Sequence, residues 1–238
     1  MISIQNLNKY YGKLHVLRDI NLELNNGECV AFIGPNGCGK TTLMKCILGL
    51  VTPQSGKVLV NGYNVQDNPL CRADIGFMPQ KSSFPENMTV GQTISTLLNV
   101  RKYHGQLDKE LYDRFNIPSI ANKRTNALSG GTSQKVNAAV AFLFHPQILI
   151  LDEPAASLDP ITSEILKEKI QKEKAKGKLI FITSHILSEL EDLATHIVFM
   201  EEGKIILHHS VEELQQITGE KSITKSIMKI LNDNEINR

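Results

Sequence analysis

The sequence lacks any marked excess of charge and any long apolar segment. It has 26 Lys and Arg residues against 25 Asp and Glu residues, so its formal net charge is only +1. A charge this close to zero gives no long-range field that would recruit nucleic acid or an anionic membrane surface. No apolar run reaches the roughly 18 residues of a membrane-spanning helix, and the polar first residues do not resemble a signal peptide. We therefore expect a soluble protein that binds no nucleic acid and meets a membrane only through a partner.

Cysteine pairs with the spacing of a metal or redox motif are also missing. The four cysteines, Cys29, Cys38, Cys46 and Cys71, form no C-x-x-C pair. Cys38 lies inside a phosphate-binding pattern, where a disulfide would obstruct the site. This usage favours a reducing, cytoplasmic compartment.

Short apolar runs alternate with helical patterns along most of the chain. Strands are predicted at residues 29–33, 58–60, 148–151, 179–183 and 197–200. The runs at 148–151 and 179–183 are apolar without alternation, as expected when helices cover both faces of a mainly parallel sheet. Residues 2–7, 19–24 and 58–60 come with Asn-Gly turns instead of helices, which predicts an antiparallel β layer beside that sheet.

A helical segment interrupts this alternation. Apolar residues at helical spacing begin with Val90 and Ile94, further helical patterns follow at 107–115 and from Gly130, and Pro118 and residues 122–126 break the segment. We expect one domain over residues 1–238, with a helical lobe at about 89–144 inserted in a core of 1–88 and 145–220. Two short amphipathic patterns from Val211 predict a helical end, with residues 221–238 as a tail.

Residues 34–41 spell G-x-x-x-x-G-K-T between an apolar strand and a helical run. Glycines let many backbone N–H groups converge on a polyphosphate, and the helix N-terminus adds its positive dipole end. Lys40 would reach the β and γ phosphates and the Thr41 hydroxyl would bind Mg²⁺. Taken alone, this pattern indicates only a P-loop nucleotide-binding protein. The expected nucleotide-binding residues here are Gly34, Asn36, Gly37, Cys38, Gly39, Lys40, Thr41 and Thr42.

Two acids, Asp152 and Glu153, follow directly after the apolar run at 148–151. Ligands of open α/β sheets bind at the carboxyl ends of the strands, so this is a suitable place for chemistry. We expect Asp152 to hold Mg²⁺ and Glu153 to polarise the attacking water. The plain alternative is a solvated turn.

Leu128-Ser129-Gly130-Gly131 opens a helix shortly before the acid pair, and this combination resembles the ABC ATPases. The resemblance covers residues 2 to about 208 and implies ATP hydrolysis with ATP and Mg²⁺ as cofactors. It implies an α/β fold with a P-loop NTPase (RecA-like) core, a parallel sheet, an antiparallel β layer and an inserted helical lobe. It also implies that Ser129, Gly130 and Gly131 close on the γ-phosphate held by a partner subunit.

The resemblance assigns four further residues by position. Tyr11 is similar to the aromatic residue that stacks on adenine, although the adjacent Tyr10 could take that role. Gln80 resembles the glutamine that senses Mg²⁺ and the attacking water. Asp159 lies in the stretch Ser157-Leu158-Asp159-Pro160, which resembles the D-loop at the dimer interface. His185 resembles the switch histidine on the γ-phosphate. The plain alternatives are a core aromatic for Tyr11, a surface amide for Gln80 and a helix cap for His185.

The resemblance therefore implies a catalytic set and a metal-binding set. The catalytic residues would be Glu153, His185 and Gln80, and the metal-binding residues Thr41, Gln80 and Asp152. Two departures from the family pattern stand out. Thr132 replaces the usual glutamine after the signature glycines, and Ala155-Ala156 replaces a stretch that usually contains threonine.

By the same resemblance, the partners are a second ABC ATPase subunit, expected to be another copy of this chain, and an integral membrane permease. The protein would be cytoplasmic and peripheral on the inner face of the cell membrane. Family analogy places the permease contact near residues 80–90, where Phe84, Pro85, Met88 and Val90 form an apolar set. The alternative is that these residues anchor the helical lobe.

The overall pattern is similar to ATPases of the Nos copper-processing system, which implies a copper-related role in nitrous oxide reductase maturation. The competing class is a soluble ABC ATPase that acts on ribosomes or DNA. Such proteins carry two cassettes on one chain, long coiled coils or zinc cysteines, and this sequence has one set of motifs and no such segments.

Overall fold

The computed structural model describes residues 1–82, 84–184 and 190–236. Its central feature is a six-stranded sheet in the order β10-β9-β3-β8-β7-β6. Strands β9, β3, β8, β7 and β6 run parallel, and β10 pairs antiparallel with β9 at one edge. The strands of this sheet are β3 (Cys29–Ile33), β6 (Ile75–Met78), β7 (Ile148–Asp152), β8 (Leu179–Thr183), β9 (His196–Glu201) and β10 (Lys204–Ser210).

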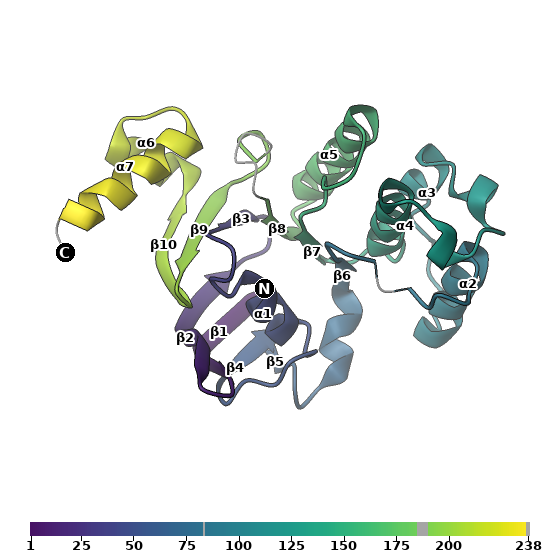
Figure 1. Ribbon diagram of the computed structural model, residues 1–238, viewed down its shortest axis with the longest axis horizontal. Helices are drawn as coiled ribbons and strands as arrows, with labels where there is room; N and C mark the ends of the chain where they lie inside the picture. Colours follow the sequence, from purple (N-terminus) through teal and green to yellow (C-terminus); the bar gives the residue numbers. More distant parts are fainter. Residues whose placement is uncertain (83, 185–189, 237–238) are drawn as a thin grey trace.

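A second, four-stranded sheet is antiparallel and has the order β2-β1-β4-β5. Its strands are β1 (Ile2–Tyr11), β2 (Leu14–Leu24), β4 (Ser55–Val60) and β5 (Tyr63–Asn64). In Figure 1 this sheet, drawn in purple and blue, lies below the central sheet.

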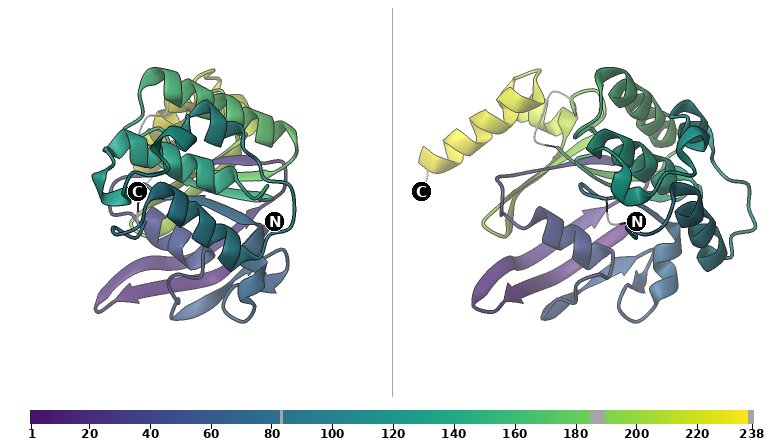
Figure 2. Two further views of the ribbon diagram at one scale, coloured as in Figure 1. Left: turned by 90° about the vertical axis from the view of Figure 1, so that its right-hand side faces the viewer. Right: turned by 45° about the vertical axis from the view of Figure 1, so that its right-hand side comes forward.

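The helices lie around the central sheet and at both ends of the molecule. They are α1 (Lys40–Ile47), α2 (Val90–Arg101), α3 (Glu110–Arg114), α4 (Gly130–Phe142), α5 (Pro160–Ala175), α6 (Val211–Thr218) and α7 (Ile223–Ile236). Short 3-10 helices cover Pro69–Asp74, Ile117–Ile120 and Thr125–Ala127. Helices α2, α3 and α4 lie at one end of the long axis, and α6 and α7 lie at the other (Figures 1 and 2).

The central sheet separates two apolar clusters because successive side chains of a strand point to opposite faces. In β8, Ile180 and Ile182 join the cluster that contains α4 and α5. Leu179 and Phe181 join the cluster that contains α1 and the antiparallel sheet, where Phe181 stacks on Phe32 with ring centroids 4.7 Å apart. Both faces are buried, which explains the continuous apolar runs of these strands.

The predicted fold class is confirmed, and the strands predicted from apolar runs are present: β3 and β8 with the predicted bounds, and β4, β7 and β9 with longer ones. Two strands of the central sheet, β6 and β10, were not predicted, nor was helix α5. Among the helices of the described residues, none is both long and apolar enough to cross a membrane.

Candidate active site

The loop between β3 and α1 is held so tightly that only glycine fits at two of its positions. A Cβ on Gly34 would lie 2.0 Å from the Met200 carbonyl oxygen. Gly39, the N-cap of α1, has φ +112°, and a Cβ there would lie 2.9 Å from the Val16 carbonyl oxygen. Strands β9 and β2 therefore press directly on the loop and fix its path.

Lys40 lies at the first position of α1 and turns back over this loop. Its Nζ donates to the carbonyl oxygens of Gly34, at 2.6 Å, and Pro35, at 3.1 Å. The buried Cys38 Sγ lies 3.7 Å from the same Nζ. The ammonium group is thus positioned at the mouth of the loop, while the thiol points into the protein.

Next to the loop is a cavity that joins residues far apart in the sequence. Its volume is about 390 Å³, and it is lined by Val16, Asn36, Gly37, Gly39, Lys40, Thr41, Thr42, Gln80, Asp152 and Glu153. The phosphate-loop residues meet Gln80 and the acid pair here because parallel strands present their carboxyl ends at one edge of the sheet. Val16, on β2, was not predicted. Its only sequence signal is its position shortly after the β1–β2 turn.

Asp152 ends β7 with its side chain largely buried. Burial raises the pKa of this carboxyl, the hydrogen bond from the Thr183 hydroxyl lowers it, and the charge of Glu153 raises it further. Thr183 Oγ1 donates to Asp152 Oδ1 at 2.8 Å. With the Thr41 hydroxyl and the Gln80 amide, Asp152 provides the oxygen-rich donor set that Mg²⁺ prefers, so the residues present fit this ion.

Glu153 adopts a left-handed backbone conformation, with φ +50°. Its N–H donates to the Thr183 carbonyl oxygen at 3.1 Å and to Thr183 Oγ1 at 3.0 Å. Its Oε2 accepts a hydrogen bond of 2.8 Å from Gln80 Nε2. The carboxylate is therefore held beside the cavity, in a suitable place for polarising a water molecule.

The predicted signature residues lie outside this cavity. Ser129 caps α4 by accepting from the Thr132 N–H, and the two side-chain oxygens lie 2.8 Å apart. The departure at Thr132 thus provides a hydrogen-bond partner for Ser129. A Cβ on Gly131 would lie 2.7 Å from the Ser157 carbonyl oxygen, so the start of α4 packs against the D-loop.

Asp159 caps the next helix, α5. Its carboxylate accepts from the Thr162 N–H at 3.0 Å and the Thr162 hydroxyl at 2.7 Å, and it pairs with Lys135 Nζ at 3.2 Å. These hydrogen bonds, followed by the Lys135 contact, lower the pKa of Asp159. Lys135 on α4 thereby links the signature helix to the D-loop. Asp159 does not line the cavity beside Lys40, so its nucleotide-binding role stays a prediction.

The aromatic residues expected at the adenine do not line this cavity either. Tyr10 stacks on His15 with ring centroids 3.9 Å apart, and Lys9 Nζ lies 5.0 Å from the centre of the exposed Tyr11 ring. Their contact with adenine stays a prediction. His185 lies outside the described residues.

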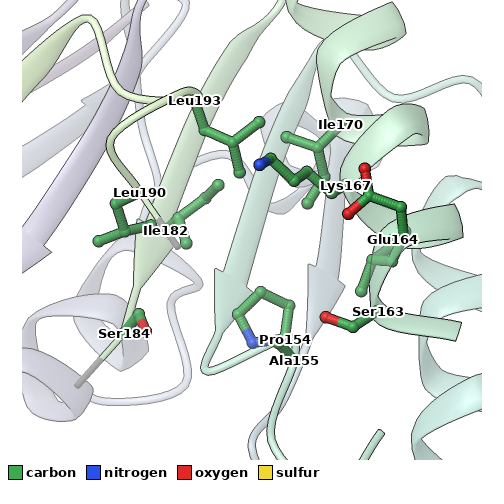
Figure 3. A pocket seen from close by; sticks show the side chains of 11 residues that line it. Pro154, Ala155, Ser163, Glu164, Lys167, Ile170, Ile182, Ser184, Leu190 and Leu193 are labelled. Atoms are coloured by element: carbon green, nitrogen blue, oxygen red, sulfur yellow. The ribbon is translucent and has the colours of Figure 1, made fainter. Parts of the chain in front are cut away.

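A second cavity, of about 270 Å³, lies between residues 154–155, α5, the end of β8 and the segment before β9. Figure 3 shows Pro154 and Ala155 on one side of it and Leu190 and Leu193 on another. The small side chain at the departure position Ala155 borders this space. Neither Asp152 nor Glu153 lines it, so it is separate from the cavity beside Lys40.

The apolar set expected to meet the permease is in part buried. Val90 is 0% exposed, and Phe84 packs against the core cluster. Pro85 is exposed, and its carbonyl oxygen accepts from the Thr125 hydroxyl at 2.6 Å. The prediction that Val90 belongs to an open docking surface is wrong, because this residue anchors α2 in the core.

Comparisons with known proteins agree with this geometry. Residues 17–156 match the family model described as ABC transporter. The lantibiotic transport ATP-binding protein SrtF of Streptococcus pyogenes is 35% identical, over 93% of this chain and 99% of the relative. The glutamine transport ATP-binding protein GlnQ of Geobacillus stearothermophilus is also 35% identical, over 98% and 100%.

Two solved structures are similar over most of their length. One, described as the ATP binding subunit of an ABC transporter, has a TM-score of 0.86 and 27% identity and covers 97% of this chain and 99% of its own. The other, a dimeric structure of the bacterial ABC transporter cassette MJ0796, has a TM-score of 0.76 and 25% identity and covers 88% and 98%.

Proposed function

Because this chain belongs to the ABC transporter family as an ATP-binding subunit with ATPase activity, we propose that it drives a separate membrane permease as half of an ATP-sandwich dimer. The observation that carries this proposal is the division of the site. Lys40, Asp152 and Glu153 share one cavity, and Ser129 and Gly131 lie outside it.

In this proposal the backbone N–H groups of residues 36–39, the α1 N-terminus and Lys40 bind the phosphates. Thr41, Gln80 and Asp152 would hold Mg²⁺, which neutralises phosphate charge when bound. Glu153 accepts a proton from the attacking water, and its hydrogen bond from Gln80 orients the carboxylate. His185 remains the predicted contact of the γ-phosphate.

The second half of each site would come from the partner ATPase. The Ser129 hydroxyl and the first N–H groups of α4 form a helix N-terminus that is suited to binding an anion. These groups do not line the cavity beside Lys40 of the same chain. The MJ0796 cassette, a similar structure, is dimeric. Both observations support a dimer in which Gly130 and Gly131 of one copy cover the γ-phosphate of the other.

A groove between the core and the helical lobe supports permease docking. It has a volume of about 260 Å³, and its apolar part includes Leu50, Phe77 and Leu97. Leu50 is largely exposed. An amphipathic helix of a permease has suitable apolar contacts here. The protein would then lie at the cytoplasmic face of the cell membrane.

Relatives of this chain are named for the transport of quite different molecules, a lantibiotic and glutamine. No cargo follows from them, and the copper-related role gains no support. The names of both relatives concern transport, so action on ribosomes or DNA is not favoured.

Glu153→Gln tests the catalytic role. The amide oxygen can still accept from Gln80, but it cannot take a proton from water, so we expect ATPase turnover to fall at least about 100-fold. ATP affinity should persist, and gel filtration with ATP should show an accumulated dimer. Glu212→Gln, an exposed change in the first turn of α6, is the matched control. Wild-type turnover in Glu153→Gln would remove Glu153 from this role.

A further inference from the structure

Thr183 is a polar residue at the end of an otherwise apolar, buried strand. It is 1% exposed, and it lies directly opposite Asp152 in the β7–β8 register. A hydroxyl in such a place is costly unless it is hydrogen-bonded. Its donor and one of its acceptor positions are used by the two acids of the active site.

The hydroxyl donates to Asp152 Oδ1 at 2.8 Å and accepts from the Glu153 N–H at 3.0 Å. The Thr183 carbonyl oxygen accepts from the same N–H at 3.1 Å. One residue thus fixes the Asp152 carboxylate and the Glu153 main chain together. Gln80 is placed differently, because its hydrogen bond goes to the Glu153 side chain.

Glu153 needs such support because its backbone is left-handed, with φ +50°, a conformation that non-glycine residues adopt rarely. The chain leaves strand β7 at this point, because the strand ends at Asp152. If the N–H were less firmly held, the carboxylate would no longer stay beside the cavity.

We propose that Thr183 is a positioning residue for ATP hydrolysis, which holds Asp152 and Glu153 in working orientation without contacting the nucleotide. This proposal rests on the role given to Glu153 above. Holding the carboxylate matters most in the transition state, because a general base must lie within hydrogen-bond reach of the water that it activates. Binding of ATP by Lys40 and the loop N–H groups depends on it much less.

The test is Thr183→Val, a nearly isosteric change that removes the hydroxyl. We expect kcat to fall about tenfold, with the KM for ATP and the Kd for ATP measured without Mg²⁺ changed less than about twofold. ATP-dependent dimer formation should persist in gel filtration. Thr183→Ser, which restores the hydroxyl without the methyl group, should recover most of the lost kcat.

Thr93→Val is the matched control, because Thr93 is also buried and its hydroxyl donates to the Thr89 carbonyl oxygen in α2. It should keep wild-type kcat. Wild-type kcat in Thr183→Val, with Glu153→Gln inactive, would overturn the role of Thr183 alone, whereas an active Glu153→Gln would overturn both roles. If Thr183→Ser is as slow as Thr183→Val, the methyl packing is responsible, and the proposal is wrong.

Discussion

The turn between β9 and β10 supports the phosphate-binding loop through its backbone. The Gly203 N–H donates to the Cys38 carbonyl oxygen at 3.0 Å, and the Gly203 carbonyl oxygen accepts from the Arg18 N–H at 2.8 Å. A Cβ on Gly203 would lie 2.5 Å from the Val16 carbonyl oxygen. This single glycine therefore connects β2 to the loop that we propose binds phosphate.

Gly203→Ala should weaken nucleotide binding and lower stability. Its φ of +80° costs an L-residue about 1 kcal/mol, and the contact with Val16 adds to that cost. Gly177→Ala is the control, because Gly177 has φ +77° and nothing within 4 Å of the added Cβ. Urea unfolding should show a larger loss of stability for Gly203→Ala than for Gly177→Ala. ATP titration should show a loss of affinity for Gly203→Ala and none for Gly177→Ala. Equal effects of the two variants would contradict the supporting role of this turn.

The residues of the site differ in how well the sequence could predict them. Lys40 and Asp152 stand in continuous motifs, where a few neighbouring residues carry the whole signal. Val16 and Thr183 come to the cavity and the acid pair from other strands, so only the assembled sheets bring them there. A hydroxyl ending an apolar run was the one signal for Thr183.

Helix α5 is joined to residues 108–110, in the segment predicted to form a helical lobe, by a buried network of charges. Lys169 Nζ lies 2.5 Å from Asp108 and 3.1 Å from Glu110, both in the lobe, and 3.0 Å from Glu173 on its own helix. Burial alone would lower the pKa of Lys169, but the hydrogen bonds that its ammonium group donates to these three carboxylates raise that pKa to about 12. A raised pKa means that this contribution to stability is present below about pH 10.4 and is lost as the pH rises toward 12.

Lys169→Met should lower the free energy of unfolding by about 3–5 kcal/mol, because it leaves buried carboxylates without their shared cation. Lys172→Met, on the same helix, removes an exposed partner of Glu110 and should cost less than about 1 kcal/mol. Urea unfolding at pH 7 measures both. A loss at Lys169 as small as that at Lys172 would show that the network does not join α5 to the lobe.

The elements missing from the sequence prediction have specific physical reasons. Strand β6 contains Gly76, a poor strand former, and a Cβ there would lie 2.2 Å from the Ala141 carbonyl oxygen of α4. Strand β10 is an edge strand whose apolar run, residues 205–207, is only three residues long and is followed by His208 and His209. Helix α5 buries Lys169 and Glu173 in its apolar stripe, which hides the helical period.

At the scale of the whole molecule, the fold class followed from the sequence because both faces of the central sheet are covered. Strands covered on both faces, such as β7 and β8, have unbroken apolar sequences. The turn-rich start of the chain predicts an antiparallel layer, and the structure has one there. What assembles around the chain is a separate question. In the function that we propose, the chain carries two half-sites, and each would be completed by the complementary half of another cassette.

Mixing two inactive variants tests whether copies of this chain share their sites. Lys40→Ala damages the phosphate loop, and Gly130→Asp places a negative charge at the signature helix, where a Cβ meets nothing closer than 3.9 Å. Each variant alone should be inactive, but a mixed dimer has one intact site, so random association should restore about a quarter of the wild-type ATPase activity.

The control for this mixture is Lys40→Ala with Glu153→Gln. Both changes fall in the same half-site, so a mixed dimer has a defect at each of its two ATP positions and should stay inactive. If ATPase activity recovers in the first mixture and not in the second, the phosphate loop of one copy must form an active site with the signature helix of another. If neither mixture recovers, the second half-site does not come from this chain, and the proposed homodimer is wrong.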